Sequence, residues 1–145
     1  MFAPAASPAH RRGQASAYSQ VLIATSVDGA SPHRLVSLLY RSIAGEIAAA
    51  RGAIARADIA EKGRAISHAV RMIEEGLRAP LDLEAGGALA LDLQGLYQYL
   101  VHRLTLANLK SDDAVLAECA RLVEVLRDGW DGMADQVEPP APEAA

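Results

Sequence analysis

The side chains that bind metal ions or catalyse reactions in proteins are few in this sequence and lie far apart along it. The four histidines are His10, His33, His68 and His102. A di-iron site in a helical bundle needs Glu-x-x-His pairs on two helices, and the sequence contains none. The single cysteine, Cys119, falls on an apolar helical stripe, where we expect a small buried side chain rather than a nucleophile. We therefore expect no metal ion, no cofactor and no enzymatic activity.

Several glycines fall inside predicted helices, where each is less favourable than alanine by ~1 kcal/mol. They are Gly45, Gly52, Gly63, Gly76 and Gly95. Two interpretations stay open for these positions. In the first, an alanine-rich sequence tolerates the glycines or uses them where neighbouring helices approach closely. In the second, the glycines keep the backbone adaptable for a partner.

The length of 145 residues suits one domain with a single apolar core. A net charge of -4, scattered basic residues and an aromatic content of 4% argue against a nucleic-acid partner. Charged or amide side chains interrupt every apolar run before ~18 residues, so we expect no membrane insertion. A lone cysteine suits a reducing compartment, and a cytoplasmic protein is the expectation.

Both ends of the chain have compositions typical of disorder. Residues 1–17 mix Ala, Pro, Ser and Gly without periodicity, and their charges follow a weakly apolar start, which is the reverse of a secretory signal. Residues 136–145 are rich in proline. We expect a helical domain over residues 18–135. It begins with a short apolar segment that is too short to fold alone and must dock on the rest.

Two long helices are predicted in the first half of this domain. Ser31 and Pro32 form a helix start, and Asp58 and Glu61 occupy the N-cap and third positions of a capping box for the next helix. Pro80 disturbs the last turn of this second helix. The first helix, to about residue 57, presents an apolar stripe of Leu35, Leu39, Ile43, Ile47, Ala50 and Ile54. The second is predicted to bury Ile59, Ile66, Val70, Ile73 and Leu77.

The third predicted helix begins after the Gly86-Gly87 connection, ends near Asn108 and is apolar nearly all round. Its stripe is Leu89, Leu93, Leu96, Leu100, Leu104 and Ala107. Further apolar residues fall elsewhere on the helical wheel: Leu91, Tyr97, Tyr99, Val101, Leu106 and Leu109. Such a helix must be covered on more than one side. Either the other helices surround it, or part of it is left open as a groove for a partner.

A fourth helix follows possible caps at Ser111, Asp112 and Asp113 and repeats apolar residues every three to four positions, from Val115 to Met133. No stretch alternates apolar and polar residues as a strand does. Four helices joined by short connections predict an all-α fold, an antiparallel up-down four-helix bundle with a short N-terminal cap segment.

From about Tyr18 to Trp130 the chain resembles the flagellin-specific export chaperone family, FliS. The family's opening motif is similar to residues 30–35, ASPHRL, followed by Leu39-Tyr40. The family's connection between the second and third helices is similar to Leu81-Asp82 with Gly86-Gly87. Residues 96–108 resemble the third-helix signature, and residues 126–130 the closing one. The family often has Asp-Gly where this chain has Arg41-Ser42, and it usually continues the helix in which Pro80 stands.

The resemblance implies a cytosolic helical bundle that binds the C-terminal segment of flagellin, prevents its premature polymerisation and helps to deliver it to the flagellar type III export gate. One flagellin segment per chaperone is expected, with a monomer or weak homodimer when free. We expect an apolar groove lined by Tyr18, Leu22, Ile23, Ser31, Pro32, Leu35, Leu39, Tyr40, Leu96, Tyr97, Leu100, Leu104 and Asn108. The alternative is a structural or self-associating helical-bundle adaptor that has no flagellin client.

Overall fold

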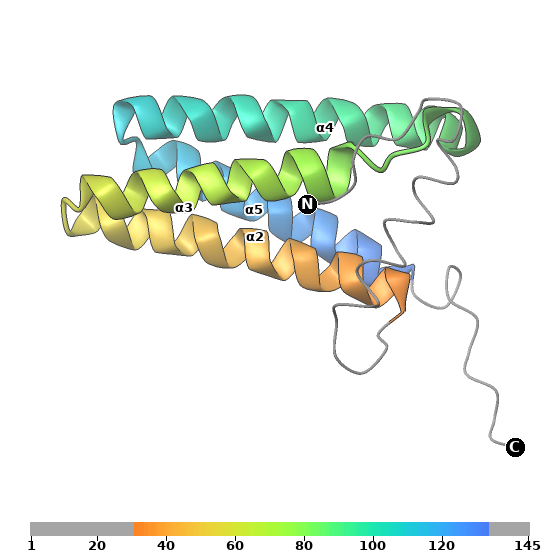
Figure 1. Ribbon diagram of the computed structural model, residues 1–145, viewed down its shortest axis with the longest axis horizontal. Helices are drawn as coiled ribbons and strands as arrows, with labels where there is room; N and C mark the ends of the chain where they lie inside the picture. The colour runs from red at the N-terminus through yellow and green to blue at the C-terminus, as the bar shows by residue number, and fades with distance from the viewer. Residues whose placement is uncertain (1–30, 134–145) are drawn as a thin grey trace, which may run out of the picture.

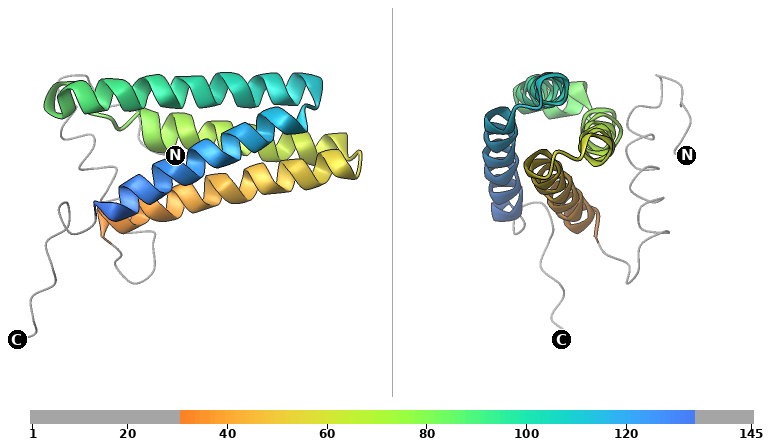
Figure 2. Two further views of the ribbon diagram at one scale, coloured as in Figure 1. Left: turned by 180° about the vertical axis from the view of Figure 1, so that it is seen from behind. Right: turned by 90° about the vertical axis from the view of Figure 1, so that its left-hand side faces the viewer.

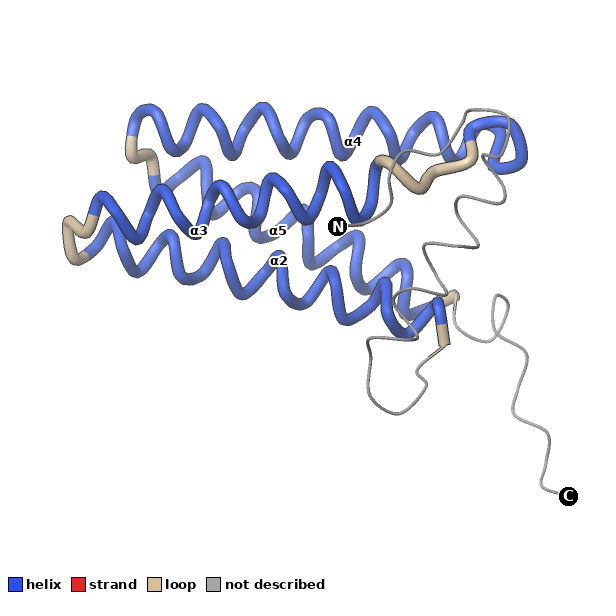
Figure 3. Tube along the Cα trace, in the orientation of Figure 1, coloured by secondary structure: helices blue, strands red, loops and turns tan. Residues whose placement is uncertain are grey.

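The computed structural model describes residues 31–133, and in this part of the chain every regular element is a helix (Figure 1, Figure 3). The elements are α2 (Pro32–Ala55), α3 (Ile59–Arg71) continued by η3 (Met72–Arg78), α4 (Leu83–Lys110) and α5 (Asp113–Gly132). Consecutive helices run in opposite directions, and the end-on view shows them round a ring in which α2 lies diagonally opposite α4 (Figure 2). The predicted all-α four-helix bundle is confirmed. The predicted tails, the cap segment and both predicted domain boundaries lie outside the described residues.

The starts of α2 and α3 follow from their capping residues. The Ser31 hydroxyl accepts a hydrogen bond from the Arg34 N–H at 3.1 Å, and Pro32 occupies the first helical position, where its missing N–H costs nothing. The Asp58 carboxylate accepts from the Glu61 N–H at 3.1 Å. The Glu61 carboxylate is bound by Arg64, so only the Asp58 half of the predicted capping box is present among the hydrogen bonds of the described residues.

The second helix changes character before Pro80, as the sequence predicts. The α-helix gives way to a π-helix from Met72 to Arg78, in which the Ala79 N–H donates to the Glu74 carbonyl at 2.9 Å. A proline cannot donate a backbone hydrogen bond, and its ring crowds the carbonyl four residues earlier. The wider turn ends the helix two residues short of Pro80.

The start of α4 differs from the prediction. The carboxylate of Asp82 accepts hydrogen bonds from the N–H groups of Glu84 and Ala85, and this cap begins a helical turn at Leu83. Gly87 then adopts φ 56° and ψ -137°, which kinks the helix before it continues to Lys110. The glycine pair was therefore correctly identified as a break, but the capped turn before it was missed.

The core is one cluster to which all four helices contribute. Its fully buried larger side chains are Tyr40, Ile43, Ile47, Ile66, Ile73, Leu100, Leu104, Leu116, Cys119 and Val123. Burial raises the pKa of the Cys119 thiol to about 11, in keeping with the small buried side chain that was predicted. Within residues 31–133, no helix is long and apolar enough to cross a membrane.

One apolar position was wrongly expected to be buried. Ile59 is 65% exposed, although it lies seven residues before the buried Ile66. The Lys62 ammonium donates to the Asn108 carbonyl at 2.9 Å and to the Ser111 hydroxyl at 2.6 Å, at the C-terminal end of α4. Ile59 stands one turn before Lys62, beyond the end of this neighbouring helix. Leu89 is also exposed, for a reason that bears on the candidate site.

Candidate docking surface

The predicted groove residues are divided between the core, the surface and the part of the chain outside the described residues. Tyr18, Leu22 and Ile23 belong to the last group. Five of the others are buried inside the bundle: Leu35, Tyr40, Tyr97, Leu100 and Leu104. Leu39, Leu96, Asn108 and the cap Ser31 are half-buried, and Pro32 is exposed. Of the larger apolar side chains, only Leu39 and Leu96 are thus partly open to a partner in this structure, and the lining role of the whole set stays a prediction.

Tyr40 and Tyr97, from the two Leu-Tyr motifs, contact each other in the core. Their hydroxyl oxygens lie 2.6 Å apart, so one donates to the other and joins α2 to the diagonally opposite α4. Burial is the main cause that raises the pKa of both hydroxyls. Apolar periodicity predicts that Tyr97 lies off the core stripe of its helix. Its hydroxyl finds a partner inside the bundle, which makes the inward orientation favourable.

Residues of the opening and closing motifs also contact each other. The rings of His33 and Trp130 stack with centroids 4.5 Å apart and an interplanar angle of 9°. His33 Nε2 donates to the Trp130 carbonyl at 2.8 Å, and Trp130 Nε1 donates to the His33 carbonyl at 2.9 Å. Ser37 of α2 also donates to the carboxylate of Asp131. These contacts hold the last turn of α5 against the first turn of α2.

As a result, α5 begins beside the end of α4 and then runs away from it towards the start of α2 (Figure 2). The predicted apolar stripe of α4 becomes more exposed towards the start of α4, where α5 no longer lies beside it. Leu104 and Leu100 are 0% and 1% exposed, Leu96 and Leu93 are half-buried, and Leu89 is 58% exposed. The stripe is a core face at one end of α4 and an open apolar face at the other.

A contact between α4 and α5 places Tyr99 beside this open stripe, and helical spacing extends the region along both helices. The Tyr99 hydroxyl and Arg103 Nε both donate to the Glu118 carboxylate, the latter at 3.0 Å. Tyr99 therefore lies on the side of α4 that faces α5, and Val125, seven residues after Glu118, lies on the corresponding side of α5. Val125 is 65% exposed and is not among the residues predicted to line the groove. A branched apolar residue off the core stripe was the available signal.

We name this region the α4–α5 face. It contains two rows of residues, each with a spacing of four along its helix. The row on α4 is Leu91, Gly95 and Tyr99, and the row on α5 is Val125, Gly129 and Met133. The half-buried Leu96 and Leu122 lie beside these rows. Tyr99, Arg103 and Glu118 form a polar cluster at one end of the face. In it, hydrogen bonds from Tyr99 and then Arg103 lower the pKa of the Glu118 carboxyl.

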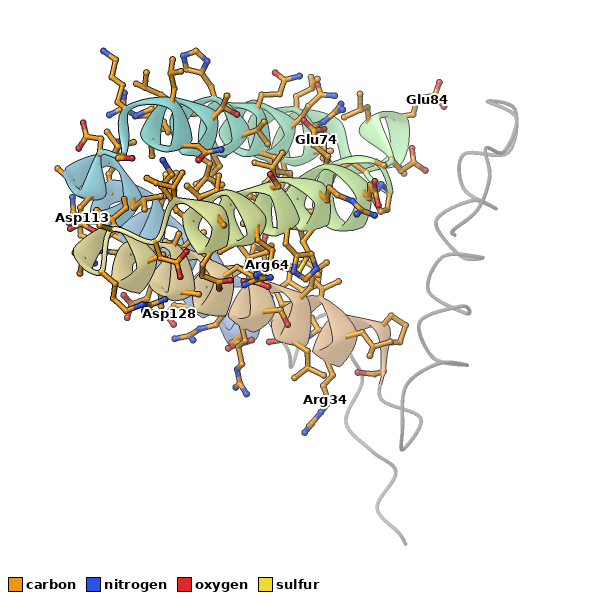
Figure 4. All side chains as sticks on the ribbon, turned by 60° about the vertical axis from the view of Figure 1, so that its left-hand side comes forward. Arg34, Arg64, Glu74, Glu84, Asp113 and Asp128 are labelled. Carbon is orange, nitrogen blue, oxygen red and sulfur yellow. The ribbon has the colours of Figure 1, made fainter. Side chains whose placement is uncertain are left out.

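Elsewhere on the bundle, ion pairs connect neighbouring helices. Arg51 of α2 forms a two-point pair with Asp113 of α5 at 2.8 and 3.0 Å. Arg64 of α3 binds Glu46 of α2 and Glu61 of its own helix. The side chains of Arg64 and Asp113, both labelled in Figure 4, are about half exposed. Among residues 31–133, no group of three or more His, Cys, Asp or Glu side chains is placed to hold a metal ion.

Comparison with known proteins gives a consistent family assignment. The family model described as Flagellar protein FliS matches residues 14–137. A Pseudomonas aeruginosa protein named Flagellar secretion chaperone FliSB is 44% identical over 116 residues, covering 80% of this chain and 91% of its own length. The Flagellar secretion chaperones FliS of Salmonella typhimurium and Bacillus subtilis are 37% and 31% identical, over 79% of this chain and 84% and 81% of their own lengths. The chain therefore belongs to the FliS family of flagellar proteins.

Proposed function

We propose that this chain is a cytoplasmic flagellar export chaperone whose client is the C-terminal segment of flagellin. The observation that carries the proposal is the 44% identity, over 91% of its length, to a protein named as a flagellar secretion chaperone. The structure adds a surface suited to such a client. The α4–α5 face exposes Leu91, Tyr99 and Val125, and the stripe of α4 opens towards Leu89 at the same end of the bundle.

Binding to such a face uses the physics of a helix in a groove. An amphipathic segment buries apolar side chains spaced three or four residues apart against the two helices of the receptor. A client that is disordered alone folds as it binds, and covering its apolar side chains keeps them from other flagellin molecules. We propose a one-to-one complex that holds flagellin unpolymerised until it reaches the export apparatus, without making or breaking a covalent bond.

The predicted groove and the α4–α5 face share Leu96, and the N-terminal segment connects to the same end of the bundle. The chain enters α2 at Ser31, in the turn that is held against Trp130. Seven residues lie between Ile23 and Ser31, so the two are up to ~26 Å apart when the chain is extended. The segment from Tyr18 to Ile23 is therefore long enough to lie over the open face. We propose that it does so in the free protein and that flagellin displaces it.

The test is to place a charge at one exposed apolar position of the α4–α5 face and at a matched position elsewhere. Val125 and Ile59 are both 65% exposed, and they lie on different helices, in the second half of α5 and at the first residue of α3. Val125→Lys should weaken binding of a flagellin C-terminal peptide in titration calorimetry by about tenfold or more, since it buries an unpaired charge. Ile59→Lys should bind as the unaltered chain does. Leu100 is unsuitable, because it is 1% exposed and a charge there disrupts the core.

Light scattering separates this function from a self-associating adaptor. A monomer that forms a one-to-one complex with the peptide supports the export chaperone. A tight dimer whose mass is unchanged by the peptide contradicts the proposal and favours the adaptor. Equal peptide affinity of Val125→Lys and the unaltered chain would show that the client binds to another surface.

A further inference from the structure

Four helix-interior glycines have no steric reason to be glycine within the fold itself. An added Cβ at Gly45, Gly63, Gly95 or Gly129 has no heavy atom within 4 Å outside its immediate helix neighbours. Glycine inside a helix is less stable than alanine, because it leaves more backbone freedom to lose on folding. Other glycines of this chain do have such a reason. A Cβ at Gly86 would lie 2.6 Å from that of Ala90, and Gly87 has a positive φ of 56°.

Two of the four glycines, Gly95 and Gly129, lie within the α4–α5 face. Gly95 lies one turn after Leu91 and one turn before Tyr99, and these side chains are 56% and 43% exposed. Gly129 lies one turn after the exposed Val125 and one turn before the half-buried Met133. Each glycine is therefore a gap in a row of apolar side chains that the described part of the fold leaves open.

Gly45 has different neighbours on the outer face of α2. One turn before it stands Arg41, and one turn after it stands Ala49. No large apolar side chain flanks it one turn away, so Gly45 is a helix-interior glycine that lies outside the proposed docking surface. Gly45 is thus a matched control for the other two positions.

We propose that Gly95 and Gly129 are the two positions at which the flagellin segment approaches the chaperone backbone most closely. This inference rests on the proposed function and names residues that determine its specificity. The distance between two packed helices depends on the side chains at their contact, and a glycine permits the closest approach. Larger apolar side chains on the client then fill the space beside each glycine, between the side chains one turn before and one turn after it.

The experiment compares the full-length chain with Gly95→Ala, Gly129→Ala and Gly45→Ala. All three variants should melt at a higher temperature, by about 2 to 6 °C, because alanine favours the helix. For a peptide of the flagellin C-terminal segment, Gly95→Ala and Gly129→Ala should each bind about tenfold or more weakly, since one extra methyl group overpacks the contact. Gly45→Ala should bind as the unaltered chain does. Greater stability combined with weaker binding is the expected signature.

A fourth variant, Gly129→Leu, separates close approach from other roles of glycine. If the client packs against the bare backbone, leucine weakens binding more than alanine does. If the face is merely apolar, leucine tightens binding, and if glycine serves only to keep the backbone flexible, alanine and leucine weaken it equally. Either of these last two results overturns the inference, as do alanine variants that bind normally. An unaltered chain that does not bind the peptide instead overturns the proposed function, and this inference with it.

Discussion

Trp130 near the end of α5 stacks on His33 in the first turn of α2, and each side chain donates a hydrogen bond to the other residue's backbone carbonyl. The two residues are 97 positions apart in sequence. Their contact closes the bundle between its first and last described helices. It also directs α5 towards α2 and away from the beginning of α4, which leaves the α4–α5 face open (Figure 2).

We expect Trp130→Ala to lower the free energy of unfolding by about 2 to 3 kcal/mol, because it removes a half-buried ring and one hydrogen bond. His33→Ala should lower the free energy of unfolding by less, since the imidazole ring is smaller than the indole ring. The double variant should show a coupling of about 0.5 to 1.5 kcal/mol, the contribution of the stacked rings. Urea unfolding measures all three values, with Leu38→Ala on the exposed face of α2 as a control of small effect. Strictly additive losses would mean that the rings do not stabilise each other.

The Tyr40–Tyr97 pair predicts an unusual pattern of stability in phenylalanine variants. Tyr40→Phe or Tyr97→Phe leaves the other hydroxyl buried without its partner, at a cost of about 1 to 3 kcal/mol. Replacing both removes both polar groups, so the double variant should lose less stability than the sum of the single variants. Urea unfolding of the four proteins measures this. A double variant that loses the full sum would show that the hydroxyls stabilise the fold independently.

Burial of these hydroxyls also predicts how stability depends on pH. Both tyrosine pKa values are raised in the folded chain, whereas an unfolded tyrosine ionises near pH 10. The stabilisation is therefore fully present below about pH 10 and is lost above it, by about 1.4 kcal/mol per pH unit for each hydroxyl. The Tyr40→Phe/Tyr97→Phe variant should lose stability less steeply in urea titrations above about pH 10. Cys119 is present in both proteins, so its raised pKa cancels in the comparison. Parallel curves would contradict the prediction.

The proposed cover over the α4–α5 face predicts opposite effects of truncation on binding and on solubility. Without residues 1–24, every molecule has an open face, so the flagellin peptide should bind more tightly. The exposed apolar surface should also make the free protein aggregate sooner. Calorimetry and light scattering measure the two effects. If the truncated protein instead loses stability and binds more weakly, the segment is a permanent part of the fold.

Salt should change the affinity for the flagellin peptide only modestly. The α4–α5 face is mainly apolar, and Glu118 at its edge is already paired with Arg103 at 2.9 Å. Between about 0.05 and 0.5 M salt we expect less than a threefold change in affinity, together with a negative heat-capacity change on binding. Asp92→Asn, which alters a charge on the same side of α4, should also have little effect. A steep loss of affinity with salt would indicate that charge pairs dominate the contact.

The sequence by itself determined several local features of the fold. Ser31 and Asp58 begin their helices as predicted, because a cap is a contact within a single turn. The π-helix before Pro80 and the kink at Gly87 likewise reflect the local chemistry of one residue. Apolar periodicity was also enough to predict four helices and a bundle.

Only the tertiary structure decided which apolar residues are covered. Leu89 and Leu104 belong to one stripe in the sequence, but the first is 58% exposed and the second 0%. Tyr97, which lies off that stripe, is buried against Tyr40. Periodicity defines the direction in which a side chain points on its own helix. It does not define where the neighbouring helix ends or how far it diverges, and here this depends on the distant contact between His33 and Trp130.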